Sequence, residues 1–187
     1  MSEVLETMKA TGIVRRIDDL GRIVIPKEIR RTMRIREGDP LEIYTERDGS
    51  VIFKKYSLMG GLSEFSSEFC ESLSRTTGHV AVITDRDNVI AAFGAPRREL
   101  MDKQLSEQVE ELLESRQMYQ HKQGEGAIPL CSDNSNYCLD IAAPILAEGD
   151  VLGSVMFVAP EENLTGGEVD YKLAQSVATF LGRHMEG

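Results

Sequence analysis

The sequence has no apolar run that approaches the roughly 20 residues needed to cross a bilayer, so no membrane-spanning helix is expected. Its first residues, MSEVLETM, have neither the basic region nor the apolar core of a signal peptide. We expect the folded part to begin at Met8, with residues 1–7 forming a leader or an alternative start. Only 3 cysteines occur in 187 residues, an odd number that suits a reducing compartment better than a disulfide framework. We therefore expect a cytoplasmic protein that does not attach to membranes.

The residue patterns of metal sites and of common enzymes are also absent from the sequence. His79, His121 and His184 lie far apart, and no cysteine pair has the C-x-x-C spacing of a zinc site. No Gly-rich phosphate loop and no Ser-His-Asp arrangement occurs, so neither catalytic residues nor a bound metal are expected. One enzymatic alternative stays open, because Cys131 and Cys138 flank the turn SDNSN and would suit a redox pair if they met. A free cysteine, however, is more often a small buried apolar residue.

The charge of the chain is divided unequally along its length. The net charge is −10, which taken alone argues against binding to nucleic acid. Residues 1–57, however, hold 12 Lys+Arg and 10 Asp+Glu, whereas residues 58–187 hold 9 and 21. Within residues 9–36 there are 9 basic and 3 acidic residues, a net charge of +6. A basic surface on an acidic protein is typical of a polyanion site, and the alternative is a charged face that is merely solvated.

The residues before position 57 are predicted to form short elements around little apolar core. Alternating and β-branched residues predict strands at 10–17, 22–25, 41–46 and 50–56, and the four-residue spacing of Ile29 and Met33 predicts a helix at 27–35. Pro26 ends the second strand and suits the start of a helix, while Arg47-Asp48-Gly49 predicts a hairpin turn. So small a core is marginal for a monomer, and its strands leave open edges. An intertwined dimer would solve both problems.

A short hinge is predicted at 57–61, where Gly60-Gly61 interrupts the pattern, and a larger domain follows it. Helices are predicted at 62–78, 105–116 and 164–185, and strands at 79–84, 89–94, 126–131, 137–146 and 151–159. Ser106 is expected to cap the second of these helices, and Thr165 with Glu168 has the spacing of a capping box. The order predicts an antiparallel sheet of about five strands with helices packed on it.

Two expectations concern the interior and the surface of this larger domain. Apolar stripes at 62, 65, 69 and 73 and at 169, 173, 177 and 181 are expected to pack within the domain, leaving other helix faces to pair between subunits. A cavity for a small effector would be lined by strands 79–94 and 137–146 and the segment between them. The alternative is a filled pocket in a domain that serves only dimerisation.

Residues 8–44, MKATGIVRRIDDLGRIVIPKEIRRTMRIREGDPLEIY, closely resemble the transition-state regulator (AbrB-type) family of swapped-hairpin DNA-binding domains. In that family two chains interleave their hairpins into one barrel-like body, which implies a homodimer that binds double-stranded DNA. The family's DNA-contacting arginines correspond here to Arg15, Arg22, Arg30 and Arg31, and the basic residues Arg16 and Lys9 lie on the same predicted strand as Arg15. A guanidinium group suits phosphates and guanine edges alike. The alternative for some of these arginines is an ion pair with Asp18, Asp19 or Glu28 inside the dimer.

A domain of this kind followed by a sensor-like α/β domain resembles two-domain regulators of sporulation genes, in which the second domain is of the GAF type. The resemblance implies an α+β protein with a swapped-hairpin β-barrel dimer at 8–56, a hinge at 57–61 and a GAF-like domain at 62–187. It further implies a cytoplasmic activator or repressor of transcription, without a cofactor, that the second domain assembles into a homotetramer. For that domain, a pocket that binds a small effector and a filled pocket without a ligand are the two alternatives.

Two other functions are weighed against transcription regulation. A small-molecule-binding or cysteine redox enzyme with an appended dimerisation domain has no need of the +6 charge within 9–36. An antitoxin is the other alternative, because similar swapped-hairpin domains occur in toxin–antitoxin pairs. Antitoxins usually end in a disordered tail that binds the toxin, whereas residues 62–187 are patterned like a folded domain.

Overall fold

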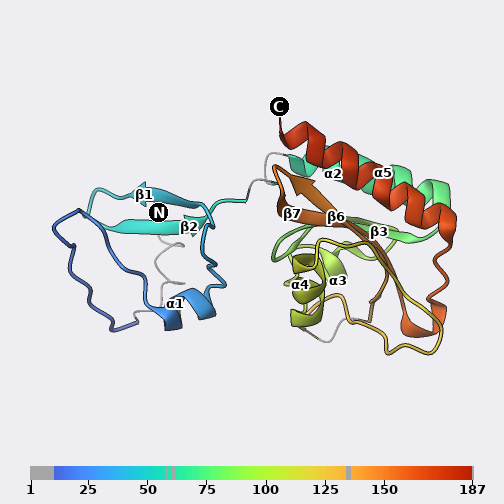
Figure 1. The fold of residues 1–187 in the computed structure, drawn as a ribbon, viewed down its shortest axis with the longest axis horizontal. Helices are drawn as coiled ribbons and strands as arrows, with labels where there is room; N and C mark the ends of the chain where they lie inside the picture. Colours follow the sequence, from blue (N-terminus) through green and yellow to red (C-terminus); the bar gives the residue numbers. More distant parts are fainter. Residues whose placement is uncertain (1–10, 58, 60–61, 134–135, 187) are drawn as a thin grey trace. The chain divides into compact units, whose positions relative to one another are not determined.

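A computed structural model gives the fold of the chain and describes residues 11–57, 59, 62–133 and 136–186 (Figure 1). The leader expected at 1–7 and the candidate Lys9 lie outside the described residues. Contacts between residues divide the chain into two compact units, residues 1–39 and 40–187.

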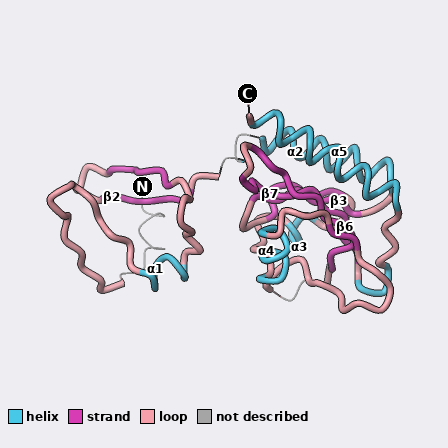
Figure 2. Tube along the Cα trace, viewed as in Figure 1, coloured by secondary structure: helices cyan, strands magenta, loops and turns pink. Residues whose placement is uncertain are grey.

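The described part of the first unit contains one helix, α1 (Lys27–Thr32), and no strand (Figure 2). The strands predicted at 10–17 and 22–25 are therefore wrong for the described residues of a single chain. A strand needs a neighbour that completes its ladder of hydrogen bonds, and this segment has none. Its apolar side chains are left in solvent, since Val14, Ile17 and Val24 are 87, 66 and 70% exposed.

A β-hairpin follows the first unit, as the sequence predicts. Strands β1 (Leu41–Thr45) and β2 (Val51–Lys55) pair antiparallel, with Leu41 opposite Lys55 and Thr45 opposite Val51. The turn between them holds Asp48, whose Oδ1 accepts a hydrogen bond from the Ser50 N–H at 2.8 Å, and Gly49, at φ 91°. The left-handed backbone at Gly49 explains why an Asp-Gly pair is favoured in this turn.

A five-stranded antiparallel sheet with helices on both faces makes up most of the second unit (Figure 1). The strand order is β4-β3-β7-β6-β5, with β3 at Val80–Asp85, β4 at Val89–Phe93, β5 at Tyr119–Gln120, β6 at Cys138–Ala147 and β7 at Asp150–Ala159. The long helices α2 (Ser63–Thr77) and α5 (Glu168–Met185) cover one face of this sheet, and the short helices α3 (Arg97–Leu100) and α4 (Glu107–Glu114) lie at the other. A 3₁₀ turn, Glu161–Asn163, precedes α5.

The number of strands in the sheet is as predicted, but the identity of one strand is not. The predicted strand 126–131 makes only isolated bridges, from Pro129 to Cys138 and from Cys131 to Leu105. Pro129 has no N–H for a ladder, which explains why a continuous strand does not form. The edge position beside β6 is taken by the two-residue strand β5, which the sequence analysis missed.

Of the two predicted helix caps, one is confirmed and the other is wrong. Ser106 caps α4 as predicted, since its Oγ accepts a hydrogen bond from the Val109 N–H at 3.2 Å. The predicted capping box of Thr165 and Glu168 is wrong by two residues, because α5 begins at Glu168 and Asp170 Oδ2 accepts from the Gly167 N–H at 2.9 Å.

Apolar side chains fill both faces of the sheet. On the α2 and α5 face the buried cluster includes Ile83, Phe157 and Leu181, and Phe65 and Phe69 of α2 pack against it. The stripe predicted on α2 is therefore confirmed. On the α3 and α4 face, Val82, Val89 and Leu139 are fully buried together with Leu105 and Leu130. Side chains of the strands proposed to line an effector cavity, among them Val82, Val89 and Leu139, belong to this buried cluster, and the choice between an effector cavity and a filled pocket stays a prediction.

Helix α5 is held against β6 at two points. Near the start of the helix, Oδ2 of the buried Asp140 accepts hydrogen bonds from the Thr165 and Gly166 N–H groups, at 3.1 and 2.7 Å. Near its end, a Cβ placed on Gly182 would lie 2.1 Å from the Leu146 carbonyl oxygen. Gly153 of β7 is equally confined, since a Cβ there would lie 1.9 Å from the Thr84 carbonyl oxygen. Both glycines are required by close backbone approach.

The last residue of β2 and the segment after it bond to the end of β3 and to the turn that follows β3. Lys55 forms an ion pair with Asp87, and the Ser57 hydroxyl donates to Asp85 Oδ2 at 3.0 Å. These bonds help to explain why the hairpin and the five-stranded sheet fall into one compact unit. The domain boundary predicted at 57–61 lies inside that unit and stays a prediction.

Candidate nucleic-acid interface

A tight turn at residues 18–22 carries the first candidate arginine. The Asp18 N–H donates to the Arg22 carbonyl and the Gly21 N–H donates to the Asp18 carbonyl, both at 3.0 Å. Gly21 has a φ of 76°, a left-handed conformation that glycine adopts without strain. A three-residue loop that ends in such a glycine is a common hairpin connection. The sequence Asp-Asp-Leu-Gly-Arg therefore reverses the chain and places Arg22 at the exit of the turn.

Asp18 and Arg22 form an ion pair within this turn. The Arg22 Nε–H donates to Asp18 Oδ2 at 2.8 Å, and the Arg22 backbone N–H donates to Asp18 Oδ1 at 2.8 Å. These bonds hold the pKa of the Asp18 carboxyl below its usual value, first through the backbone N–H of Arg22 and then through its guanidinium. An ion pair with Asp18 is the alternative to DNA contact for this arginine, yet the Arg22 side chain is still 68% exposed.

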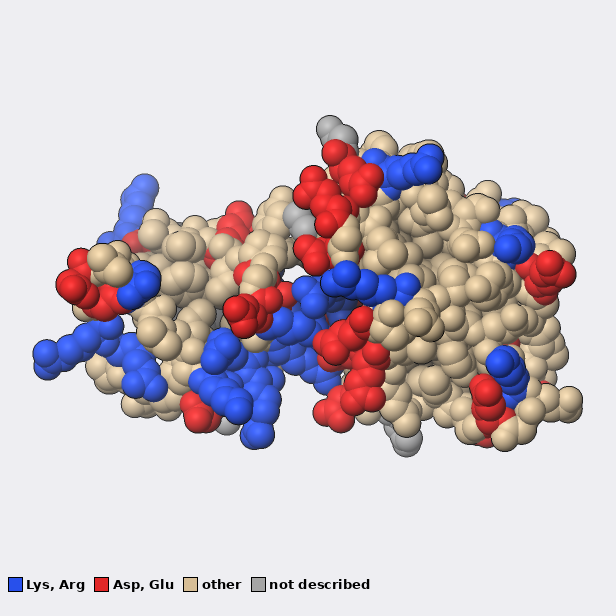
Figure 3. Space-filling view, viewed as in Figure 1, with Lys and Arg blue, Asp and Glu red and all other residues tan. Residues whose placement is uncertain are grey.

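Helix α1 carries Arg30 and Arg31. The helix follows Pro26, and its Ile29 is half-buried while both arginines are exposed. It stops three residues earlier than predicted, and Arg34 beyond it has a positive φ of 50°. In Figure 3 the Lys and Arg side chains form a dense group over α1. A six-residue helix thus presents two neighbouring guanidinium groups to solvent.

Every described candidate residue is exposed. Arg15 and Arg16 lie on the segment that enters the 18–22 turn, and the bond from the Asp18 N–H to the Arg22 carbonyl joins its two arms. Their contact with DNA stays a prediction. Asp18 was not predicted as part of the DNA site, although its four-residue distance from Arg22 across Leu20-Gly21 was a usable signal.

The three cysteines are free thiols, and two of them are buried. Burial raises the pKa of Cys70 to about 12. The pKa of the half-buried Cys138 is also raised, first by burial and then by Glu161 and Glu162. Because the thiolate is the reactive form, these surroundings oppose redox chemistry.

We expect alkylation of the native protein at pH 8 to modify Cys138 slowly and to spare Cys70 and Cys131. Cys70 and Cys131 are 0 and 2% exposed, so a reagent reaches them only when the domain opens. Peptide mass spectrometry of samples labelled with iodoacetamide, before and after denaturation in urea, measures this. Rapid labelling of Cys131, or a Cys131–Cys138 disulfide formed in mild oxidant, would favour the redox enzyme instead.

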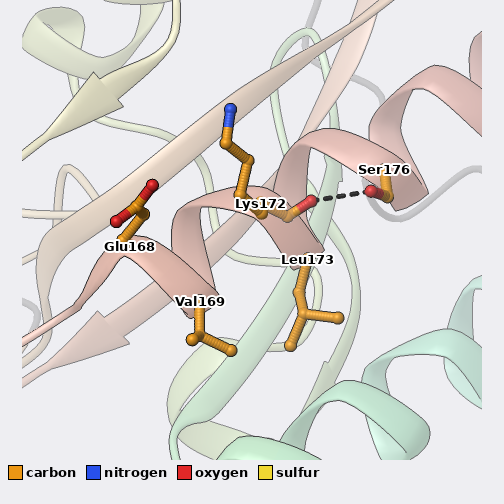
Figure 4. A pocket seen from close by; sticks show the side chains of 5 residues that line it. All are labelled: Glu168, Val169, Lys172, Leu173 and Ser176. Carbon is orange, nitrogen blue, oxygen red and sulfur yellow. Dashed lines mark hydrogen bonds between the residues drawn. The ribbon is translucent and has the colours of Figure 1, made fainter.

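A shallow groove of about 380 Å³ lies on α5 (Figure 4). Its lining consists of Glu168, Val169, Lys172, Leu173 and Ser176. Val169 is 71% exposed, so the expectation that it packs within the domain is wrong, whereas Leu173 and Val177 pack against the core and Leu181 is buried. Helix α5 therefore keeps apolar surface in solvent at its N-terminal end.

Within the described ranges, no helix has the length and apolar character needed to cross a membrane. The same residues contain no group of three or more His, Cys, Asp or Glu side chains that could hold a metal ion.

The N-terminal third of the chain is similar to transition-state regulators. It is 61% identical over 49 residues to Transition state regulatory protein AbrB of Bacillus subtilis, a match that covers 26% of this chain and 50% of that protein. Residues 14–58 also match the family model described as Antidote-toxin recognition MazE, bacterial antitoxin. All of the candidate DNA-binding residues except Lys9 lie within residues 14–58.

The larger domain has the GAF fold. The GAF domain of PixJ from Thermosynechococcus elongatus superposes with a TM-score of 0.52 at 10% identity, covering 71% of this chain and 89% of that one. So low an identity establishes the fold alone. The chain is thus an α+β protein that joins an AbrB-type domain to a GAF-like domain, as the sequence predicts.

Residues 61–186 match the family model described as Stage V sporulation protein T C-terminal, transcription factor. Stage V sporulation protein T of Bacillus subtilis is 44% identical over 179 residues, which cover 96% of this chain and 99% of that protein. The chain belongs to the stage V sporulation protein T family. The class of function predicted from the sequence, transcription regulation in sporulation, is thereby confirmed.

Proposed function

We propose that this chain is a cytoplasmic, non-enzymatic regulator of sporulation genes that binds double-stranded DNA through the arginines of residues 15–31. The observation that carries the proposal is the exposure of Arg15, Arg16, Arg22, Arg30 and Arg31 within a segment of net charge +6, on a chain of net charge −10. Planar, permanently charged guanidinium groups bind phosphates and guanine edges. The match to the antitoxin model covers only residues 14–58, whereas the sporulation relative matches nearly the whole chain.

The DNA-binding unit is a homodimer with interleaved hairpins. Support comes from the apolar side chains that one chain leaves in solvent, among them Val14, Leu20 and Val24, and from the missing strands at 11–25. A second copy would supply the ladder partner and cover these side chains. Two-fold symmetry would also place two copies of each arginine on the assembly.

The GAF-like domain joins two such dimers into a homotetramer and binds no cofactor. The exposed Val169, which lines the α5 groove, and Phe180, which is 47% exposed, support a contact between copies on this helix. The buried cluster around Val82, Val89 and Leu139 supports a filled interior. Mass spectrometry of small molecules retained by the purified protein tests whether the interior is filled, since a stoichiometric effector would contradict a filled interior.

Alanine in place of Arg22 or Arg30 should weaken DNA binding at least tenfold while the protein stays folded, because each dimer loses two guanidinium contacts. The probe is the duplex that the wild-type protein enriches most strongly from a random-sequence pool, here named the selected duplex. If about six phosphates are neutralised per dimer, log K of the wild type should fall with log salt at a slope near −5.

Arg75→Ala is the matched control. Arg75 is an exposed arginine in an ion pair with Glu71 four residues away, as Arg22 is with Asp18, but it lies on α2. The Arg75→Ala variant should bind the selected duplex as tightly as the wild type. Wild-type affinity in Arg22→Ala or Arg30→Ala, or a salt slope shallower than about −2, would contradict the proposal that these arginines bind DNA.

A further inference from the structure

Both carboxylate oxygens of Asp18 accept hydrogen bonds from the loop that carries Arg22. Oδ1 accepts hydrogen bonds from the Leu20 and Arg22 backbone N–H groups, at 3.0 and 2.8 Å. Oδ2 accepts from the Arg22 Nε–H at 2.8 Å. The two backbone bonds fix the carboxylate relative to the main chain, so the third bond fixes the guanidinium relative to the turn.

The pairing uses only one side of the guanidinium group. Arginine has five N–H donors, and Asp18 takes the one on Nε. In the described part of the chain the four donors on the Nη atoms have no acceptor, and the side chain is 68% exposed. A guanidinium held by Nε thus offers its outer edge to a ligand, and this edge can form two parallel hydrogen bonds with a phosphate or a guanine.

We propose that Asp18 is a positioning residue of the DNA site, which holds the Arg22 guanidinium in one orientation before DNA binds. This inference rests on the proposed function, in which Arg22 contacts DNA. A free arginine side chain loses rotamer freedom when it binds, and a side chain that is already ordered by a fixed carboxylate loses less. The lowered pKa of Asp18 agrees with this role, because the carboxylate stays ionised at neutral pH.

Simple electrostatics makes the opposite prediction, and this makes the inference testable. A carboxylate near DNA repels phosphates, so its neutralisation should tighten binding. If Asp18 positions Arg22, its neutralisation should weaken binding instead. Asp18→Asn is the informative change, because the amide oxygen can still accept from the Leu20 and Arg22 N–H groups and thereby keep the turn.

The experiment compares full-length Asp18→Asn with full-length Asp19→Asn on the selected duplex. Asp19 is the exposed neighbour, and it makes no hydrogen bond among the described residues. The two variants change the charge equally at adjacent positions. We expect Asp18→Asn to bind about tenfold more weakly, the cost of ordering one arginine side chain in each of two subunits, and Asp19→Asn to bind as tightly as the wild type or more tightly. Equal or tighter binding by Asp18→Asn overturns the inference.

The background variant Arg22→Ala separates positioning from a general loss of folding. If Asp18 acts through Arg22, then adding Asp18→Asn to Arg22→Ala should cause no further loss of affinity. A further loss of tenfold in that background shows that Asp18 supports the turn rather than the guanidinium, and overturns the inference. If Arg22→Ala weakens binding but Asp18→Asn does not, only the positioning role fails. If Arg22→Ala binds like the wild type, the role of Arg22 in the proposed function fails as well.

Discussion

A chain that ends at Tyr56 should bind the selected duplex about 10²- to 10⁴-fold more weakly than the full-length chain. The proposed tetramer carries two DNA-binding dimers, so the second contact with DNA is intramolecular once the first has formed. The avidity of the linked faces is lost when residues 57–187 are removed, although no arginine of the DNA site is touched. Sedimentation with a parallel DNA titration measures the assembly and the affinity together.

Two controls accompany the shortened chain. Residues 58–187 alone, with 9 basic and 21 acidic residues, should self-associate and should not bind DNA. Full-length Asp87→Asn removes the acidic partner of Lys55 but keeps the second domain, and it should bind like the wild type. Affinity of the shortened chain equal to that of the full chain would refute the avidity argument, as would a monomeric 58–187 fragment.

Gly153→Ala should destabilise the GAF-like domain by about 3 kcal/mol, and its melting temperature should fall by about 10 °C. The added methyl group would lie 1.9 Å from the Thr84 carbonyl oxygen and 2.9 Å from the carbonyl carbon. Both atoms belong to the main chain of β3, which pairs with β7 from Val80–Val158 to Asp85–Gly153. Relief of the clash therefore requires strand separation rather than a change of rotamer. Thermal unfolding of the full-length protein, followed by circular dichroism, measures the effect.

Gly126→Ala is the control for this change. Gly126 also lies in the GAF-like domain, its φ is outside the left-handed range, and no atom lies within 4 Å of the added Cβ. We expect its melting temperature to stay within about 2 °C of the wild type. If the two alanine variants have the same melting temperature, the close approach of β7 to β3 does not make Gly153 necessary for stability.

The elements that the sequence predicts well are those whose signal is local. The apolar spacing of residues 62, 65, 69 and 73 predicts α2, and Asp48-Gly49 predicts the β1–β2 turn, because in both cases the residues that form the structure are close in sequence. The strand expected at 126–131 failed because Pro129 interrupts a ladder that apolar content alone suggests. The two-residue β5 has no periodicity to detect.

The N-terminal strands failed for a different physical reason. Residues 11–17 and 22–25 alternate and are β-branched, but among the described residues of a single chain they pair with no neighbouring strand. The same limit applies to the candidate site. The sequence identified the arginines through family resemblance, whereas the role of Asp18 depends on the path of the turn, which brings its carboxylate to the Arg22 Nε.

The two attachment points of α5 on β6 have a mechanical consequence. Asp140 and Leu146 lie six residues apart on the strand; Asp140 contacts Gly166, two residues before α5 begins, and Leu146 contacts Gly182 near its end. Strand and helix therefore run in the same direction over a span of about 20 Å, with hydrogen bonds to Asp140 at one end and a close backbone approach at Leu146 at the other. Sliding of α5 along β6 would break the hydrogen bonds to Asp140, and rotation of the helix would drive its side chains into the Leu146 carbonyl. We therefore expect α5 and β6 to move together when a partner presses on the α5 groove.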